Sequence, residues 1–466
     1  MTRTYIGELE QHVGEEVLIK GWVHVRRDQG KLIFFEFRDL TGFVQGVILP
    51  NAKDAHAVGS TLRSEWVVAV TGKVNKRPDK NIKADTQNGT IELEILGITV
   101  LNEAVTPPFD LATDGTEIGE EVRMKYRYTD LRRERMQRNL RLRNKAIQFI
   151  RSYLLGEKFI EVETPILTKS TPEGARDYVV PSRVYQGKFY ALPQSPQQYK
   201  QLLMVGGVEK YFQIARCFRD EDTRGDRQPE FTQLDMEMSF VEQEDVMQLV
   251  ESMMIELIKA VAPHKKIQET PFPRISYADA MKQYGNDRPD IRKDKTDPDL
   301  LAFCWVINFP FFEKTETGGW TFTHNPFSRP IPEHEEWLAK KENLGDIITT
   351  QYDIVLNGFE VGGGSIRNHR PEALKKVFEI MGFSDEKIEE NFGHMLNALA
   401  SGAPPHGGIA PGIDRLIMIL AGEPNIREVI AFPKTGEGRD LMMEAPSTLA
   451  PEQLVELGIS IKAPKK

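Results

Sequence analysis

The sequence has little of several features that would indicate a secreted, membrane-embedded or zinc-binding protein. Its 466 residues include only two cysteines, too few for a disulfide framework or a set of zinc-binding thiolates. No apolar run approaches the roughly 20 residues that a membrane-spanning helix needs, and the first residues lack the apolar core of a signal peptide. There is also no low-complexity block and no short-period repeat. We therefore expect a cytoplasmic protein with no membrane partner.

The composition is that of an ordinary globular protein, with 40% hydrophobic and 28% charged residues. The length exceeds that of one hydrophobic core and predicts two or three domains. The net charge of -9 does not exclude nucleic acid, because binding follows local patches of charge. Residues 123–145 form such a patch, with ten Lys or Arg against two acids. A phosphate contact and a solvated helix face rich in ion pairs both explain it.

The first 104 residues contain five short strand-like segments separated by turn residues. They lie at residues 16–24, 32–38, 43–49, 66–72 and 91–96. Five such strands predict a small β-barrel of the OB type, which binds oligonucleotides on one face and its loops. Residues 105–130 carry prolines and acids without clear periodicity, and we interpret them as a hinge or linker.

A helical pattern begins near residue 131 and ends at Gly156, and a strand-like segment follows at 159–163. The most informative stretch is 218–235, a charged loop between the strand-like segments 210–217 and 231–240. Alternate strand residues share a face, which places Gln233 and Asp235 on one surface. Charged groups on a rigid sheet suit phosphate transfer, where catalysis is mostly positioning and charge neutralisation. An ordinary hairpin with a solvated tip is the simpler interpretation of this stretch alone.

Further motifs favour the first interpretation. Residues 352–367 contain three consecutive glycines, and residues 407–415 run Gly-Gly-Ile-Ala-Pro-Gly-Ile-Asp-Arg. Together with Pro165 and the 218–235 stretch, they resemble motifs one, two and three of class II aminoacyl-tRNA synthetases. In detail the chain resembles, from end to end, the bacterial-type aspartyl-tRNA synthetases, also through residues 171–177 and 194–200.

The resemblance implies an α+β fold with two main parts. Residues 1–104 would be a five-stranded OB-fold barrel that binds the anticodon. Residues 131–466 would be a class II catalytic domain built on an antiparallel β-sheet flanked by helices. The inserted domain of the bacterial family would be reduced here to a short link near 286–299. The helix and strand before Pro165 form much of the dimer interface in this family, so we expect a homodimer.

The implied activity is ATP-dependent attachment of L-aspartate to tRNA(Asp) through an aspartyl-adenylate, with release of AMP and pyrophosphate. Arg219 and Arg415 would be the catalytic residues, because a fixed guanidinium stabilises developing negative charge. Asp353 and Glu360 match the magnesium ligands of the family, in keeping with the preference of Mg²⁺ for hard oxygen donors. The implied ATP-binding residues are Arg219, Asp220, Glu221, Gln228, Phe231, Glu360, Gly412, Ile413, Asp414 and Arg415.

The implied aspartate-binding residues carry opposite charges. Lys200 and Arg367 match the residues that hold the side-chain carboxylate of aspartate. Two buried cations would reject asparagine, whose amide would leave them unpaired. The remaining matches are Glu173, Ser195, Gln197 and Asp235 at the ammonium end, Arg219 at the α-carboxylate, and His324. The family often has a second histidine where this chain has Asn325.

The implied anticodon contacts are Arg27, Phe34 and Gln45, which supply a cation, an aromatic platform and an amide. Gln29 stands where relatives specific for tRNA(Asp) tend to carry Leu and those that also charge tRNA(Asn) tend to carry His. Discrimination between the two tRNAs therefore stays open, and so does a non-discriminating ligase that feeds an amidotransferase. An asparaginyl enzyme fits Lys200 with Arg367 less well. A tRNA-binding paralogue without ligase activity has no support in the motifs, and an asparagine synthetase of this fold would lack the barrel.

Overall fold

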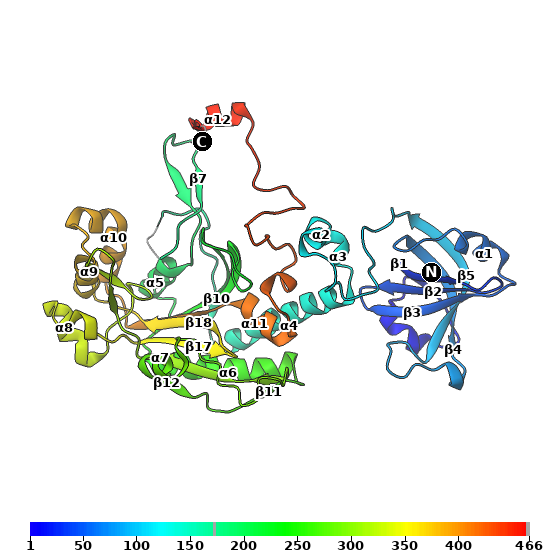
Figure 1. The fold of residues 1–466 in the computed structure, drawn as a ribbon, viewed down its shortest axis with the longest axis horizontal. Coiled ribbons are helices and arrows are strands. Elements are labelled where there is room, and N and C mark those ends of the chain that lie inside the picture. The colour runs from blue at the N-terminus through cyan, green and yellow to red at the C-terminus, as the bar shows by residue number, and fades with distance from the viewer. Residues whose placement is uncertain (171–173, 463–466) are drawn as a thin grey trace. The chain divides into compact units, whose positions relative to one another are not determined.

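The five N-terminal strands close into a barrel in the order β1-β2-β3-β5-β4 (Figure 1). Their bounds are β1 (Glu16–Asp28), β2 (Ile33–Asp39), β3 (Gly42–Ile48), β4 (Val67–Lys76) and β5 (Ile91–Asn102), accompanied by η1 (Ile6–His12), α1 (Lys53–Gly59) and η2 (Asp79–Asn81). Alternate residues fill the interior: in β2, Ile33, Phe35 and Phe37 are buried. The predicted OB-type barrel is confirmed.

The structure, a computed structural model, describes residues 1–170 and 174–462 and separates into two units, Met1–Glu134 and Arg135–Lys466. The first unit contains the barrel and the short helices α2 (Glu120–Lys125) and α3 (Arg127–Asp130). These helices lie in the segment that we interpreted from the sequence as a hinge or linker.

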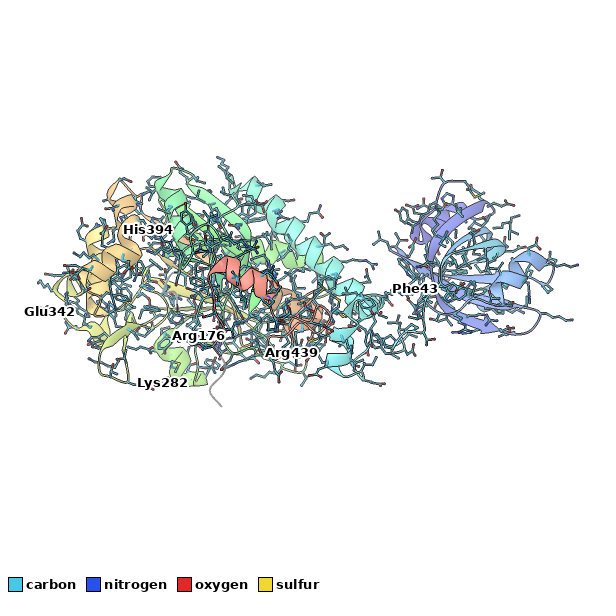
Figure 2. The ribbon with its side chains drawn as sticks, turned by 90° about the horizontal axis from the view of Figure 1, so that it is seen from above. Phe43, Arg176, Lys282, Glu342, His394 and Arg439 are labelled. Carbon is cyan, nitrogen blue, oxygen red and sulfur yellow. The ribbon has the colours of Figure 1, made fainter. Side chains whose placement is uncertain are left out.

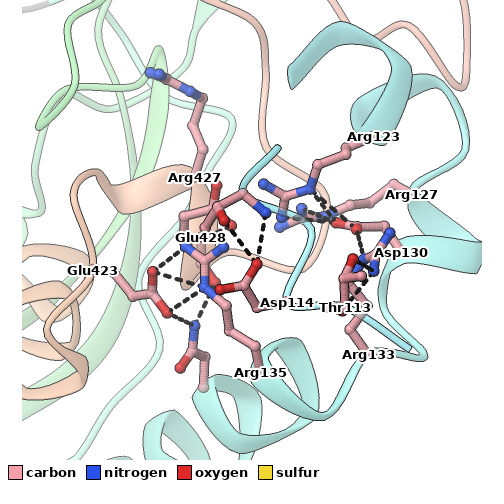
Figure 3. A network of polar contacts seen from close by, with 12 residues as sticks. Thr113, Asp114, Arg123, Arg127, Asp130, Arg133, Arg135, Glu423, Arg427 and Glu428 are labelled. Carbon is pink, nitrogen blue, oxygen red and sulfur yellow. Dashed lines mark hydrogen bonds and ion pairs between the residues drawn. The ribbon is translucent and has the colours of Figure 1, made fainter. Parts of the chain in front are cut away.

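A buried ionic cluster holds the two short helices together. Figure 3 shows Arg123, Arg127 and Arg133 around the carboxylate of Asp130, with nitrogen-to-oxygen distances of 3.0, 2.9 and 2.8 Å. Burial raises the pKa of Asp130, but the three guanidinium groups outweigh it and bring the pKa below its ordinary value. The carboxylate is therefore charged at neutral pH.

The second unit is built on an eight-stranded sheet in the order β12-β14-β17-β18-β19-β10-β9-β6. Its strands are β6 (Ile160–Glu161), β9 (Lys210–Phe218), β10 (Glu230–Ser239), β12 (Arg274–Ser276), β14 (Phe303–Ile307), β17 (Gln351–Leu356), β18 (Phe359–Ile366) and β19 (His406–Pro411). The central pairs are antiparallel, as predicted, but β12 pairs with β14 and β6 with β9 in parallel. The sheet is therefore antiparallel at its centre, as expected, with one parallel pair at each edge.

Long helices cover one face of this sheet, and the opposite face carries polar residues of the central strands. The long helices α4 (Glu134–Gly156) and α6 (Gln243–Val261), with α11 (Ile413–Ala421), contribute to the main hydrophobic core. In β10, Leu234, Met236 and Met238 point into that core. Strand alternation therefore turns Gln233, Asp235 and Glu237 toward the opposite face. No helix within the described ranges is long and apolar enough to cross a membrane.

The remaining elements lie around the sheet. The helices are α5 (Gln197–Val205), α7 (Tyr277–Tyr284), α8 (Glu335–Lys340), α9 (Pro371–Ile380), α10 (Asp385–Ala400) and α12 (Pro451–Leu457), with short helices η3 (Pro332–His334), η4 (Leu344–Asp346) and η5 (Ile426–Glu428). The small strand pairs are β7 (Val179–Pro181) with β8 (Phe189–Ala191), β11 (Lys266–Ile267) with β13 (Leu300–Leu301), and β15 (Phe312–Lys314) with β16 (Trp320–Phe322). Residues 285–299 connect α7 to β13 without a helix or strand.

Candidate active site

The polar face of the sheet forms one wall of a cavity of about 530 Å³. This volume lies within the range of small-molecule sites. Most residues predicted for the site line it: Ser195, Gln197, Lys200, Arg219, Glu221, Gln228, Phe231, Asp235, His324, Glu360, Arg367, Gly412, Asp414 and Arg415. Asp220, Asp353 and the core residue Ile413 do not line it. Glu173 falls outside the described residues.

Two buried cations and the buried Asp235 line the floor of the cavity, and a second buried acid, Glu237, pairs with both cations without lining it. Lys200 Nζ lies 2.8 Å from Asp235 Oδ1 and 3.3 Å from Glu237 Oε2. Arg367 donates two hydrogen bonds to Glu237, of 2.8 Å from Nε and 3.1 Å from Nη2. All four residues are at most 3% exposed. Such a set presents charges of both signs to a small zwitterionic ligand.

The two acids of this floor differ electrostatically. Burial raises the pKa of Asp235 above its ordinary value, although Lys200 lies beside it. Burial acts in the same direction on Glu237, but there Arg367 and Lys200 prevail and the pKa of Glu237 falls below its ordinary value. Glu237 is therefore the stable counter-ion of the two cations.

Sequence reasoning missed Glu237, although a signal was present. Asp235 and Glu237 have the same parity in β10, so a strand that turns Asp235 toward the site must turn Glu237 the same way. Its role depends on Lys200 from α5 and Arg367 from the end of β18, which only the tertiary fold brings together.

Arg219 begins the charged loop between β9 and β10, whose antiparallel pairing was predicted. Its guanidinium carbon lies 5.0 Å from the centroid of the Phe231 ring. Its Nε is buried and has no hydrogen-bond partner in the part of the chain that the structure describes. A guanidinium group whose Nε lacks a partner in a polar cavity is available to an anionic ligand.

Gln228 has a fixed amide orientation. Its Oε1 accepts a hydrogen bond of 2.7 Å from the backbone N–H of Lys434, while its buried Nε2 has no partner among the described residues. Glu221, on the same loop, lies 3.8 Å from Arg227. The backbone N–H of Asp220 donates to the backbone carbonyl of Arg176, an exposed residue labelled in Figure 2.

The residues at the start of α11 have two different roles. Arg415 donates to the backbone carbonyl of Glu360 at 2.7 Å and pairs with Asp226 at 3.1 Å, which aims it across the cavity. Both oxygens of Asp414 are in use, one by Arg143 at 2.5 Å and the other by the backbone N–H of Thr232 at 2.8 Å. Asp414 therefore anchors β10 to the neighbouring helices.

Asp353 and Glu360 converge on one point above β18. A Cβ placed on Gly363 would lie 2.8 Å from Asp353 Oδ1 and 3.6 Å from Glu360 Oε1. Burial, reinforced by the charge of Glu360, raises the pKa of Asp353 well above its ordinary value. The described residues contain no cluster of three or more acids, histidines or cysteines that could hold a metal alone. The pair therefore fits a hard cation that takes its other ligands from phosphate oxygens.

Gly364 shows why glycine is required next to this acid pair. A Cβ on Gly364 would lie 2.1 Å from the carbonyl oxygen of Gly408 and 2.8 Å from the Cα of Ile409. The backbones of β18 and β19 approach so closely that they exclude side chains here. The adjoining part of the cavity wall is bare backbone.

His324 and Asn325 occupy the loop that follows β16. The ring of His324 contacts Phe309 edge-on at a centroid distance of 4.6 Å, and burial lowers its pKa. Asn325 donates to Gln351 Oε1 at 3.1 Å, and Gln351 in turn donates to Asp353 Oδ1 at 2.9 Å. Asn325, which stands where the family often has a second histidine, thus helps to orient Asp353 of the acid pair.

The four predicted anticodon residues lie on the first unit. Arg27 and Phe34 are direct cross-strand partners, and so are Gln45 and Glu36. Phe35 is buried in the barrel, so alternation turns Phe34 to the outer face together with Arg27 and Gln45. Gln29 is exposed in the turn after β1. This outer face combines a cation, an aromatic ring and an amide.

Comparisons with known proteins bear on both units. Residues 119–436 match the family described as tRNA synthetases class II (D, K and N), and residues 17–101 match the OB-fold nucleic acid binding domain. The chain is 41% identical to the aspartate–tRNA(Asp/Asn) ligase of Rubrobacter xylanophilus, over 98% of this chain and 96% of the relative. It is 41% identical to the aspartate–tRNA ligase of Geobacillus kaustophilus, over the full length of both. Its fold is similar to asparaginyl-tRNA synthetase from Pyrococcus horikoshii complexed with asparaginyl-adenylate, with a TM-score of 0.75, 23% identity and coverage of 97% and 100%.

Proposed function

Because the chain belongs to the class II tRNA synthetases of the aspartate, lysine and asparagine group, we propose that it attaches L-aspartate to tRNA at the expense of ATP. The reaction has two steps. The α-carboxylate of aspartate attacks the α-phosphorus of ATP and releases pyrophosphate, and a ribose hydroxyl of tRNA then attacks the aspartyl-adenylate and releases AMP.

The charge pattern of the cavity floor carries this proposal. Lys200 and Arg367 together hold the side-chain carboxylate of aspartate, and Asp235 holds its ammonium group. Asparagine would place a neutral amide against two buried cations that prefer a carboxylate, at a cost of several kcal/mol. Ser195, Gln197 and His324 complete the pocket, and Glu173 contributes at the ammonium end.

The nucleotide occupies the other half of the cavity. Phe231 stacks on the adenine, Arg219 neutralises charge on the α-phosphate, and Arg415 reaches the terminal phosphate. Gln228 Nε2, whose amide is fixed by Lys434, donates to an acceptor of the nucleotide. Asp353 and Glu360 would hold Mg²⁺, which supplies charge neutralisation on the phosphates. The backbone at Gly412 allows close approach of the ATP.

A ligase that charges both tRNA(Asp) and tRNA(Asn) is the second candidate. The Rubrobacter relative is named for both tRNAs and the Geobacillus relative for one, at equal identity to this chain. Gln29 matches neither usual residue at its position. Its exposure in the turn after β1 makes it accessible to the anticodon, together with Arg27, Phe34 and Gln45.

We further propose that the enzyme is a cytoplasmic homodimer. The strand β6 lies at the edge of the eight-stranded sheet, and its Ile160 is 53% exposed. An exposed apolar edge beside α4 suits a second copy of the chain. Sedimentation that gave a monomer at every concentration would contradict the dimer.

We also propose that the chain lacks a domain that its relatives carry. The Rubrobacter alignment extends over 584 positions against 466 residues here, so more than a hundred positions have no counterpart. Residues 285–299, which contain no helix or strand, are the place where such a domain would be inserted.

The decisive experiment is aminoacylation with labelled aspartate on transcripts of tRNA(Asp) and tRNA(Asn), with ATP-pyrophosphate exchange measured alongside. Charging of the first transcript alone establishes a discriminating ligase. Comparable charging of both establishes the second candidate. Absence of both aspartate-dependent exchange and charging would refute the proposed function.

A further inference from the structure

A second cavity, of about 290 Å³, lies between α8 and α9 and shares no lining residue with the active-site cavity. The two helices lie side by side in Figure 1, and Glu342, labelled in Figure 2, follows α8. Apolar side chains form part of its wall, among them Pro330, Leu338 and Ala373. A cavity of this size and lining suits a small, partly apolar molecule.

A buried amide in this cavity lacks a partner. Asn368 is only 4% exposed, and its Nδ2 has no hydrogen-bond partner within residues 1–170 and 174–462. Its backbone N–H bonds to the carbonyl of Phe327 at 2.7 Å, which fixes the residue in place. An unsatisfied buried donor costs about 1–3 kcal/mol. A hydrogen-bond acceptor in the cavity would remove that cost.

The N-terminus of α9 opens into the same cavity. The helix has ten residues, begins at Pro371 after Arg370, and has no side-chain cap. Arg370, Glu372 and Ala373 from this end line the cavity. The first turn of a helix carries free N–H groups and a partial positive charge, and both attract anions. The N-terminus of α9 and the amide of Asn368 thus both favour a ligand atom that accepts hydrogen bonds.

The side-chain cations of the cavity differ in how well they are paired. Three cations line it, Arg329, Arg370 and Lys376, against Glu335 and Glu372. Two of them also pair at 2.9 Å with acids outside the lining, Arg329 through Nη2 with Glu242 and Lys376 with Glu379. Glu335 lies 3.8 Å from both Arg329 and Arg370, too far for a hydrogen bond, and the buried Nε of Arg329 has no hydrogen-bond partner in the described chain. The Nε of Arg329 and the guanidinium of Arg370 are therefore donors that Glu335 does not satisfy.

We propose that this cavity binds a small organic carboxylate with an apolar body. The carboxylate accepts hydrogen bonds from Asn368 Nδ2 and the first turn of α9, within reach of Arg329. The apolar body packs against Leu338 and Ala373. A carboxylate suits the site better than inorganic phosphate, because part of the wall can contact only an apolar group.

The test is isothermal titration calorimetry on the full chain with saturating L-aspartate and a non-hydrolysable ATP analogue, so that both halves of the active-site cavity are filled and the probes do not enter it. The probes are benzoate, its neutral isostere benzamide, and inorganic phosphate. We expect benzoate to bind in the millimolar range or tighter, and benzamide and phosphate to bind at least tenfold more weakly. Equal binding of benzoate and benzamide, or no detectable binding of benzoate, would overturn the proposal.

Variants locate the site. Asn368→Asp replaces the donor by a negative charge of the same size and should abolish benzoate binding. Lys376→Gln should weaken it several-fold. The matched control is Lys375→Gln, because Lys375 lies on the same helix and pairs with an acid, Asp385, as Lys376 pairs with Glu379, but does not line the cavity. Loss of binding in the Lys375 variant, or full binding in the Asn368 variant, would refute the assignment.

A variant with a larger side chain in the cavity provides a second test if Asn368→Asp does not fold. Ala373→Leu adds volume at a half-buried position of α9 without removing any polar group. It should block benzoate while the thermal unfolding midpoint stays within a few degrees of the parent. Unchanged benzoate affinity in a folded Ala373→Leu protein would place the ligand elsewhere and contradict the proposal.

Discussion

Replacement of Glu237 by glutamine tests the electrostatic design of the cavity floor. Glu237 accepts two hydrogen bonds from Arg367 and lies 3.3 Å from Lys200, with its side chain fully buried. Glutamine has the same shape but no charge. It keeps one acceptor oxygen and turns an N–H group toward the guanidinium, so at least one charge-assisted hydrogen bond is lost.

The magnitude follows from two separate losses. Breaking a buried ion pair by neutralising one partner costs about 3–5 kcal/mol of folding free energy. A lost hydrogen bond to a charged group is worth about 1.5–3 kcal/mol. If Glu237 holds Arg367 in position for aspartate, that second loss lowers kcat/KM for aspartate roughly 10- to 150-fold, at about 1.4 kcal/mol per tenfold.

The assay is ATP-pyrophosphate exchange with aspartate and ATP varied separately, together with urea unfolding. We expect the KM for aspartate to rise and the KM for ATP to change little. Glu256→Gln is the control, since Glu256 forms a surface pair with Lys259 at 2.7 Å and such pairs contribute about 0–1 kcal/mol. A Glu237→Gln protein with the parent's aspartate KM and unfolding midpoint would refute the reasoning.

Three further changes test other parts of the molecule. Asp353→Asn should stabilise the magnesium-free protein at neutral pH by about 1.4 kcal/mol per unit of pKa elevation and abolish exchange. Because the folded-state pKa of Asp353 is raised, its carboxyl group favours folding of the parent protein at low pH, and this contribution is lost as pH rises through that pKa. Urea titrations in EDTA at neutral pH that gave the Asp353→Asn variant no higher free energy of unfolding than the parent would contradict this. Phe231→Ala should raise the KM for ATP roughly 5- to 150-fold through loss of about 1–3 kcal/mol of stacking, and an unchanged ATP dependence of exchange would exclude that contact. Asp130→Asn should destabilise the first unit by about 3–5 kcal/mol at pH 7, an effect that fades as pH falls through the depressed folded-state pKa of Asp130; thermal scans of parent and variant that agreed at pH 7 would rule it out.

Alternation and motif order made much of the fold predictable. The barrel strands, the β9–β10 hairpin and the common surface of Gln233 and Asp235 all follow from local patterns, because strand periodicity is encoded within a few residues. The parallel edges of the sheet could not be predicted in this way. They depend on short strands such as β6, whose two residues carry almost no periodic signal.

The partners of charged residues were the least predictable part of the site. Asp414 lies within a motif that suggests contact with ATP, yet its carboxylate binds Arg143 and the backbone of Thr232. Arg143 precedes Asp414 by 271 residues, so no local pattern links them. Asp130 shows the same limit: its segment appeared irregular in sequence, but three arginines converge on it in space.

The bare backbone where β18 meets β19 also constrains how the gene can vary. Every missense change in a glycine codon adds at least a Cβ, and at Gly364 that atom would lie 2.1 Å from the carbonyl of Gly408. Alanine is therefore no safer there than a bulky residue. An inhibitor that rested on this surface would leave few escape mutations beneath it, because substitution at Gly364 would separate two central strands of the sheet.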